Sequence, residues 1–340
     1  MPVAPDSYFT KDHIQAHAFD APLSLAEQAI HCLELVAELN WAALPFQFKG
    51  GNSLLLILQN PRRFSIDVDI ATDQKQESIE VVLDKIVKEC GVFSKWTKRQ
   101  HKTKPFIPLA SYYLFYKSHY AGPDDACIML DCQLSKSPYT TQTIPIVCGT
   151  LYKTIVKTEV PTRAGLIGDK LLTLGPTTLG IPLGKGKEAQ RIKHVFDISR
   201  LCETLPSINE IRESFTACIK QENNLQKKEI DAKDVLADTL LFCKYVITNS
   251  ANFNTENGLY PVLSETIKGL PQFASHLFCK KYEWADLQRD IARVGLCIAA
   301  ACNLDVSDGY FIKTYKSAND DPLKYWNSTV AWLKVQSHEQ

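Results

Sequence analysis

One stretch organises this chain: Phe48-Lys-Gly-Gly-Asn-Ser-Leu-Leu-Leu-Ile-Leu-Gln-Asn-Pro-Arg-Arg-Phe-Ser-Ile-Asp-Val-Asp-Ile70. It begins with a glycine pair followed by an apolar run, and it ends in a segment whose polar and apolar residues alternate. The alternation predicts a strand over residues 64–70, because side chains of a strand point to opposite faces in turn. Asp67 and Asp69 then share the face that points away from the core.

Two carboxylates side by side repel one another unless a cation lies between them. A divalent metal ion such as Mg²⁺, which prefers oxygen ligands, is the simplest such cation. Upstream, Gly50 and Gly51 fit the same interpretation, since a Gly-Gly turn that opens a helix presents backbone N–H groups to a phosphate. A nucleoside triphosphate with Mg²⁺ would suit both ends of the stretch, with its phosphates at the glycine pair and its metal ion at the two aspartates. Each half alone is also typical of an ordinary solvated turn.

Together, at this spacing, the two halves resemble the nucleotidyltransferase toxins of the AbiEii/AbiGii type. Their signature reads roughly Gly-Gly-Thr-x-Leu, a short spacer, then Arg-Phe-Ser-x-Asp-x-Asp. This chain departs from it at Asn52, where the family usually has Thr or Ser, and Ser53 supplies a hydroxyl one position later. The resemblance covers residues 25–205. It implies an α+β fold of the DNA polymerase beta-like nucleotidyltransferase superfamily: a small mixed sheet with flanking helices, then a largely helical C-terminal region.

The resemblance also implies site residues. Those expected to contact the triphosphate are Lys49, Gly50, Gly51, Asn52, Ser53, Arg63 and Ser65. Metal binding and catalysis are implied for Asp67, Asp69 and Asp131. The third aspartate lies within an apolar run, where an unpaired carboxylate is costly to bury, and the family places its third carboxylate on a neighbouring strand. An ordinary aspartate at a strand end is the alternative.

Further along the chain, the sequence around Lys170 (Asp-Lys-Leu) resembles the family's helix that supplies a catalytic lysine for the phosphates. Snorkelling is the ordinary use of such a lysine. The segment from Lys193 to Asp197 resembles the family's last motif, Arg-Asp-x-x-Asp-Leu, with His194 in place of the first Asp. The resemblance implies that Lys193 contacts phosphates and that Asp197 acts as a base or orients Lys170. An aspartate on a helix surface would look the same.

The activity that the family implies is transfer of a nucleoside monophosphate from an NTP, the substrate, to a hydroxyl acceptor, with Mg²⁺ as cofactor. The 3′ end of tRNA is the leading acceptor, and the expected role is that of a toxin or phage-defence protein with a possible cognate antitoxin. Two alternatives stay open: nucleotidylation of a protein or small molecule, and a non-catalytic nucleotide-binding partner protein. The intact carboxylates argue against the second, while Asn52 and His194 argue slightly for it.

The composition of the 340 residues is that of a globular protein, with 38 basic and 38 acidic side chains. This balance gives no case for general nucleic-acid binding, so such a surface must be local. The one dense basic run spans residues 98–104 and indicates either a solvated loop or a contact for RNA phosphates. Eleven scattered cysteines without a Cys-x-x-Cys indicate reduced thiols. No apolar run approaches the ~18 residues of a membrane span, which predicts a cytoplasmic protein without a membrane partner.

The remaining patterns predict the order of elements. Residues 1–22 are expected to form an extended arm, and a nucleotidyltransferase domain (23–175) is expected to precede a mobile loop (175–187) and a helical C-terminal region (188–340). Predicted helices span residues 23–44, 53–59, 75–90, 162–174, 235–247 and 284–301. Predicted strands span residues 46–48, 64–70, 111–117, 127–134, 144–147 and 151–156, with the third and fourth paired as an antiparallel hairpin.

Overall fold

A computed structural model describes residues 1–58, 61–99, 108–122, 125–250, 261–279 and 281–336. Its contacts divide the chain into two compact units, each of which is described by itself. The first contains residues 1–137, 141–162 and 277–279, and the second contains 138–140, 163–276 and 280–340. The predicted domains 23–175 and 188–340 stay a prediction, because compact units record contacts and not independent folding.

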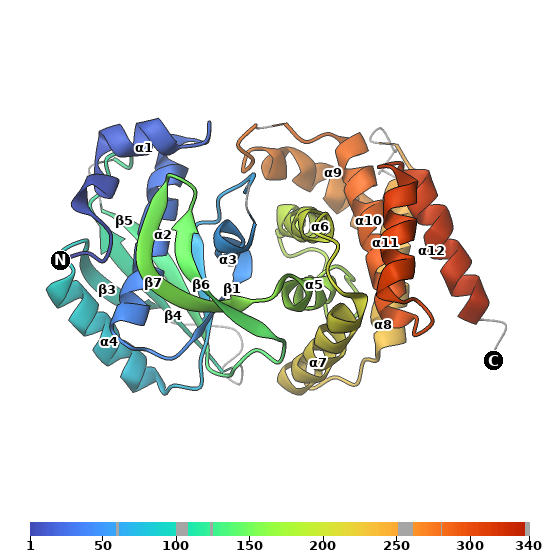
Figure 1. Cartoon of the computed structure of the whole chain (residues 1–340), viewed down its shortest axis with the longest axis horizontal. Coiled ribbons are helices and arrows are strands. Elements are labelled where there is room, and N and C mark those ends of the chain that lie inside the picture. The colour runs from blue at the N-terminus through green and yellow to red at the C-terminus, as the bar shows by residue number, and fades with distance from the viewer. Residues whose placement is uncertain (59–60, 100–107, 123–124, 251–260, 280, 337–340) are drawn as a thin grey trace. The chain divides into compact units, whose positions relative to one another are not determined.

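The first unit is built on a seven-stranded mixed sheet in the order β3-β4-β5-β2-β1-β7-β6 (Figure 1). Its strands are β1 (Gln47–Lys49), β2 (Asp67–Ala71), β3 (Phe93–Arg99), β4 (Leu109–Tyr116), β5 (Ala126–Gln133), β6 (Thr141–Cys148) and β7 (Tyr152–Pro161). Two pairs, β2 with β5 and β1 with β7, are parallel, and the others are antiparallel. The predicted hairpin of β4 and β5 is confirmed, although part of its turn lies outside the described residues.

The helices of the first unit are the 3₁₀ helix η1 (Asp6–Phe9), α1 (Lys11–His17), α2 (Leu23–Trp41), α3 (Gly50–Ile57) and α4 (Gln76–Glu89). Helix α2 packs against β7, β2 and β5, and α4 packs against β3. The apolar stripe of α4 is buried as its periodicity predicts, through Ile79, Leu83 and Ile86. These two helices therefore cover the apolar face of the sheet.

The central stretch folds as the predicted strand, turn, helix and strand. Helix α3 starts directly at Gly50, and β2 starts at Asp67 instead of residue 64. Val68 and Ile70 are fully buried, whereas Asp67 and Asp69 are half-exposed on the opposite face. The alternation therefore places the two aspartates as predicted, on a shorter strand.

One expectation about the first unit was wrong, and one strand was not predicted. Residues 1–22 are not an extended arm, because Thr10 caps a short helix: its hydroxyl accepts a hydrogen bond from His13 N. Strand β3 was not predicted, because the basic run of residues 98–104 covers only its last two residues and the other five show little apolar periodicity. Lys98 and Arg99 belong to this strand, and the remainder of the run lies outside the described residues.

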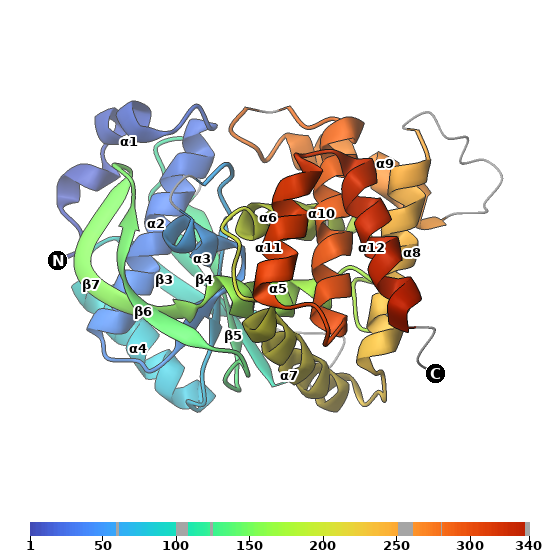
Figure 2. The same cartoon turned by 45° about the vertical axis from the view of Figure 1, so that its right-hand side comes forward.

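The second unit is helical in its described part, which confirms the predicted helical C-terminal region (Figure 2). Its helices are α5 (Arg163–Leu171), α6 (Glu188–Cys202), α7 (Ile208–Gln226), α8 (Ala232–Thr248), α9 (Pro261–Ala274), α10 (Trp284–Cys302), α11 (Asp308–Ala318) and α12 (Pro322–Gln336). Helix α10 packs against α6, α7, α8, α11 and α12. Its buried Asp290 accepts hydrogen bonds from Ser199 (2.8 Å), Arg200 (2.6 Å) and Tyr282 (2.7 Å), so the core of this unit contains a satisfied ionic cluster.

All eleven cysteines are thiols, as predicted. Over the described residues, no helix has the length and apolar character needed to cross a bilayer.

Candidate active site

Three carboxylates gather on one face of the sheet. Asp69 of β2 pairs in register with Asp131 of the parallel strand β5, and Asp67 lies two residues earlier on the same face of β2. Neighbouring strands lie only ~4.8 Å apart, so Asp69 and Asp131 are adjacent. The structure therefore brings together the three aspartates that the sequence marked from distant segments.

Polar residues paired with these carboxylates form a row across the four neighbouring strands β4, β5, β2 and β1. Ser111 of β4 pairs with Asp131 and donates its hydroxyl to Asp131 Oδ1. On the other side, Lys49 of β1 pairs with Asp69, and its Nζ donates to Gln133 Oε1 at 2.9 Å. Sequence reasoning missed Ser111 and Gln133. The alternation of β4 and β5 contained the signal, because Ser111 and Gln133 share a face with Asp131 once the hairpin register is known.

The glycine pair lets the start of α3 approach the carboxylates closely. Gly50 has φ +73°, in the left-handed region that glycine favours, and a Cβ there would lie 1.9 Å from Asp69 Oδ2. A Cβ on Gly51 would lie 2.8 Å from Ser65 Oγ and 3.1 Å from an Arg63 guanidinium nitrogen. Backbone at Gly50 and Gly51 thus lies directly against Asp69, Arg63 and Ser65.

The side chains of the next two residues point into the protein. Asn52 and Ser53 are fully buried; Asn52 Nδ2 donates to Asp67 O at 3.1 Å, and Ser53 Oγ donates to Gly50 O at 2.9 Å. These bonds hold the turn against the start of β2. Any phosphate at this turn would therefore meet backbone N–H groups of the first helical turn before it met either side chain.

The loop before β2 is held by a segment from far along the chain. Arg63 is largely buried and forms an isolated antiparallel bridge with Leu277. Phe278 N donates to Arg62 O at 3.0 Å, and the Phe278 ring lies 4.6 Å from the Phe64 ring, centroid to centroid. Residues 277–279 therefore belong to the first unit and support the loop of residues 61–66 that precedes β2.

Lys170, Lys193 and Asp197 belong to the second unit, so they are described apart from the carboxylates. Lys170 of α5 is buried, and its Nζ donates to Asp197 Oδ2 of α6 at 3.0 Å. Lys193 is half-buried on α6. The structure therefore joins Lys170 to Asp197, and the proposed phosphate contacts of these residues stay a prediction.

Oxygen donors and close spacing suit the three aspartates to Mg²⁺. Ser111 orients Asp131 through its hydroxyl, as the partners of metal ligands commonly do. In the side-chain conformations of the described residues, no three His, Cys, Asp or Glu groups converge on one point as a ready metal site. Shared coordination by the three aspartates would therefore require rotation of their side chains, which their half-exposed positions allow.

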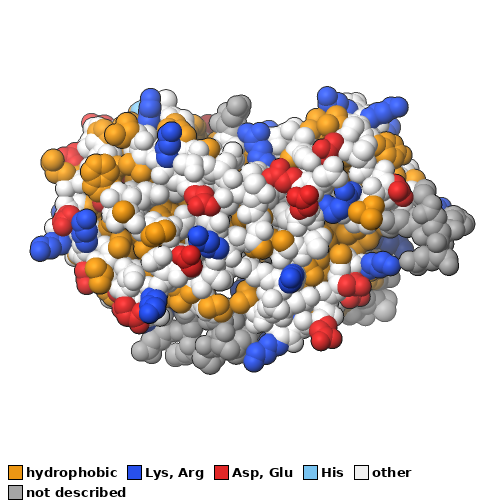
Figure 3. Space-filling model, turned by 60° about the horizontal axis from the view of Figure 1, so that its bottom comes forward, with side chains coloured by type: hydrophobic (Ala, Val, Ile, Leu, Met, Phe, Trp, Pro, Cys, Tyr) orange, Lys and Arg blue, Asp and Glu red, His pale blue; other side chains and the backbone are white. Residues whose placement is uncertain are grey.

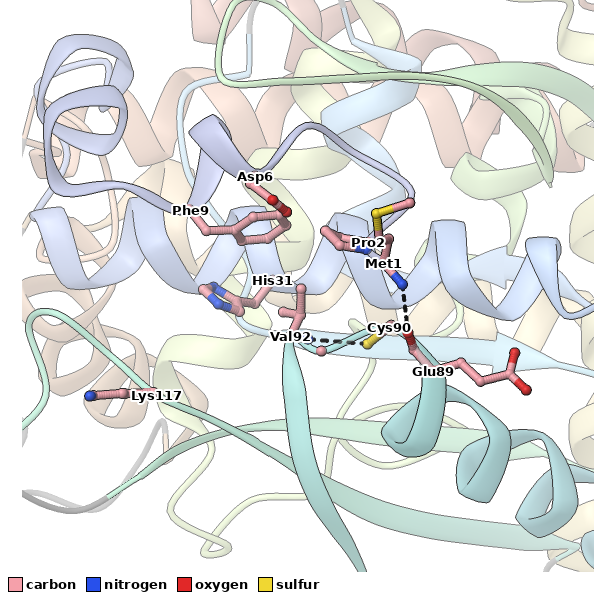
Figure 4. A pocket seen from close by; sticks show the side chains of 10 residues that line it. Met1, Pro2, Asp6, Phe9, His31, Glu89, Cys90, Val92 and Lys117 are labelled. Carbon is pink, nitrogen blue, oxygen red and sulfur yellow. Dashed lines mark hydrogen bonds between the residues drawn. The ribbon is translucent and has the colours of Figure 1, made fainter.

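A cavity of about 460 Å³ lies elsewhere in the first unit (Figure 4). It is lined by Met1, Pro2, Asp6, Phe9, His31, Glu89, Cys90, Gly91, Val92 and Lys117. His31 stacks on Tyr116 with ring centroids 3.7 Å apart, and burial lowers the pKa of His31 to about 4. The imidazole is therefore neutral at physiological pH.

The family model for the nucleotidyl transferase AbiEii toxin, type IV TA system, matches residues 39–251. The chain belongs to this family. The matched range contains the glycine turn, the three aspartates, Lys170 and Asp197, and the roles expected of these residues stay predictions. As an AbiEii family member, the protein is a nucleotidyltransferase enzyme of a toxin–antitoxin class.

Solved structures similar to this AbiEii-type chain include MenT4, a nucleotidyltransferase toxin from Mycobacterium tuberculosis H37Rv, at 14% identity over 85% of this chain and 97% of that one, with a TM-score of 0.48. Another is an antigenic nucleotidyltransferase-like protein from Paracoccidioides brasiliensis, at 15% identity over 64% of this chain and 95% of that one, with a TM-score of 0.38. No curated protein sequence matches the chain.

Proposed function

We propose that this AbiEii-type protein transfers a nucleoside monophosphate from an NTP to the 3′-terminal hydroxyl of tRNA, with Mg²⁺ as cofactor. The observation that carries the proposal is the in-register pairing of Asp69 with Asp131, with Asp67 on the same face and the glycine turn directly against Asp69. In a cell the protein acts as a toxin in phage defence, with a cognate antitoxin as its partner.

Asp67, Asp69 and Asp131 would hold the metal, which when bound supplies positive charge to the phosphates and to the attacking oxygen. The chain's own groups position the reactants, which is most of what catalysis of phosphoryl transfer requires. Backbone N–H groups after Gly50 would face the anionic phosphates, and the Ser111 hydroxyl donates a hydrogen bond to Asp131. Lys170 and Lys193 are proposed to neutralise phosphate charge, with Asp197 orienting Lys170.

Direct transfer to the acceptor is favoured over a covalent enzyme intermediate. Burial raises the pKa of the Cys32, Cys127 and Cys132 thiols, and nearby carboxylates add to the effect. These thiols are therefore protonated at neutral pH and are poor nucleophiles. Ser111 is buried, and its hydroxyl donates to Asp131. A hydroxyl of the acceptor is thus the nucleophile, and a terminal ribose of tRNA supplies one.

The test supplies purified protein with Mg²⁺, one α-phosphate-labelled NTP at a time, and total tRNA. Label is expected on tRNA and not on tRNA whose 3′ diol has been oxidised with periodate beforehand. The Asp69→Asn variant serves as the inactive control, and protein and small-molecule fractions are assayed in parallel. Label only on those fractions would move the acceptor to a protein or small molecule. No label anywhere, despite measurable NTP binding, would indicate a non-catalytic nucleotide-binding protein.

A further inference from the structure

Positive charge on this protein is dispersed. On the face shown in Figure 3, lysine and arginine side chains are interspersed with aspartate and glutamate, in keeping with 38 residues of each sign. An acceptor nucleic acid must therefore be recognised by a small local surface. The sheet face that bears the carboxylates offers one.

This face extends from the carboxylates to the edge strand β3. Directly paired residues of neighbouring strands share a face, so the register of β3, β4 and β5 identifies its members. They are Lys95, Thr97 and Arg99 on β3, Ser111, Tyr113 and Phe115 on β4, and Cys127, Met129 and Asp131 on β5. We call these nine residues the β3–β5 face. Asp67 and Asp69 adjoin it on β2.

Burial separates this face from the opposite one. On β4, Tyr112 and Leu114 of the opposite face are fully buried, whereas Tyr113 and Phe115 are half-exposed. Tyr112 contacts Glu80 of α4 through its hydroxyl, at 3.3 Å. The helical layer therefore covers the opposite face, and two aromatic rings of the β3–β5 face stay accessible.

Two cations stand beside the rings. The Lys95 ammonium lies 4.8 Å from the centre of the Phe115 ring, and Arg99 contacts the thioether of Met129 at 3.1 Å. A thioether is only a weak acceptor, and within the described part of the chain no carboxylate forms an ion pair with Lys95 or Arg99. On the opposite face of the same strand, Lys98 is paired with Glu80 at 3.1 Å. The two cations of the β3–β5 face are thus available to an anion.

We infer that the β3–β5 face binds the single-stranded end of the acceptor RNA. Tyr113 and Phe115 stack on its bases, and Lys95 and Arg99 contact its phosphates. Aromatic rings interleaved with cations on an open sheet are the usual means of binding single-stranded RNA. The inference rests on the proposed function, because it places the terminal hydroxyl at the carboxylates, of which Asp67 lies two strands and roughly 10 Å away from Tyr113. Phosphates then leave toward the basic edge, away from the repelling aspartates.

The test measures binding of a labelled twelve-nucleotide single-stranded RNA to the full chain by fluorescence anisotropy, over a range of salt concentrations. Tyr113→Ala is expected to weaken binding about tenfold, within the range for loss of one base stack. The Lys95→Ala and Arg99→Ala variants are each expected to reduce the salt slope by about 0.7, the value for one phosphate contact on a single strand. Lys98→Ala is the matched control and should bind like the wild type.

Unchanged RNA binding in Tyr113→Ala and in the Lys95→Ala/Arg99→Ala double variant would overturn the inference, as would an equal loss in Lys98→Ala. Thermal unfolding and NTP affinity, measured on each variant, should match the wild type. Wild-type labelling of tRNA with undiminished RNA binding by the variants would remove the inference and leave the proposed function standing. If the wild-type protein labels no RNA but the variants lose RNA binding, the RNA-binding face stands and the proposed function falls.

Discussion

Gly50 is under two constraints, one from its backbone and one from its neighbour. Its φ of +73° disfavours any residue with a Cβ, and a Cβ would also lie 1.9 Å from Asp69 Oδ2. Gly91 offers a comparison, since it has φ +78° but no atom within 4 Å of the place where its Cβ would lie. Substitutions at Gly50 and Gly91 can therefore separate the effect of backbone strain from the effect of crowding the Asp69 carboxylate.

Gly91→Ala is expected to lower the free energy of unfolding by about 1–2 kcal/mol through backbone strain alone, with normal nucleotide transfer. In Gly50→Ala, displacement of Asp69 adds about 1–3 kcal/mol of overpacking and removes most of the transfer activity. Chemical denaturation and kcat/KM measure the two effects. Equal behaviour of the two variants would show that the approach of Gly50 to Asp69 does not matter.

Asp67→Asn and Asp69→Asn are each expected to reduce nucleotide transfer by more than the roughly 10–100-fold typical of losing an outer partner of a metal, because each removes a metal-binding charge. The thermal midpoint without metal should hold or rise, since one of several like charges is gone. Asp73→Asn is the control, as Asp73 is exposed and forms a surface ion pair with Lys136 at 3.4 Å. Full activity with normal Mg²⁺ dependence in either variant would show that Asp67 and Asp69 do not form the metal site.

At the scale of elements, the sequence predicted α4, α8 and α10 well, because each has a clear apolar stripe. It also predicted the aspartate face of β2, since strand alternation assigns faces regardless of where the strand begins. The resemblance placed Asp131 on a strand beside Asp69, but the sequence did not identify Ser111 and Gln133 as their neighbours, because the neighbours of a strand in a mixed sheet depend on chain topology. Strand β3 was missed because five of its seven residues are exposed, so it has little apolar signal.

The ion pair between Lys170 of α5 and Asp197 of α6 allows the proposed role of Lys170 to be tested. Lys170→Ala should destabilise the second unit by about 3–5 kcal/mol, because it removes a cationic partner of the buried Asp197 carboxylate. Lys170→Met/Asp197→Leu should recover much of that stability and allows NTP affinity to be measured on a folded protein. A phosphate contact predicts a loss of about 1.5–3 kcal/mol in NTP binding. Unchanged affinity in the double variant would make the pair structural.

Two glutamates of helix α2, Glu34 and Glu38, allow a second electrostatic prediction. Burial, and then the charge of Glu34, raise the pKa of Glu38 to about 7; burial also raises the pKa of Glu34, whose carboxylate accepts from Tyr152 Oη at 2.5 Å. A raised carboxyl pKa means that the folded state holds protons which the unfolded state has released. The contribution of these two carboxyl groups to stability is therefore greatest at acidic pH and falls as pH rises from about 4.5 toward 7.

Glu38→Gln should flatten this dependence, whose slope for one proton is at most about 1.4 kcal/mol per pH unit, and should stabilise the first unit at pH 8. Denaturant unfolding at pH 5 and pH 8 measures the change. Glu77→Gln on the exposed face of α4 is the control and should leave the dependence as it is. A Glu38→Gln protein with the wild-type pH profile would contradict the assignment.

At the scale of the whole molecule, the most unusual feature is that residues 277–279 belong to the first unit. Leu277 is buried beside Arg63, so Leu277→Ala should lower the unfolding free energy of the first unit by about 2–5 kcal/mol and raise the KM for NTP by loosening Arg63. Leu323→Ala is the control, because Leu323 is 60% exposed. Circular dichroism and steady-state kinetics measure both variants. An unchanged KM in a destabilised Leu277→Ala protein would make the bridge a matter of packing alone.

This connectivity also sets a time order during synthesis on the ribosome. All seven strands of the sheet have been translated by Pro161, yet the backbone partner of Arg63 is translated only at Leu277. At 5–20 residues per second, that interval is on the order of ten seconds. A nascent chain of this protein therefore carries its carboxylates early but lacks the backbone partner of Arg63 until most of the polypeptide has emerged, so we expect its activity to begin later than the folding of the sheet.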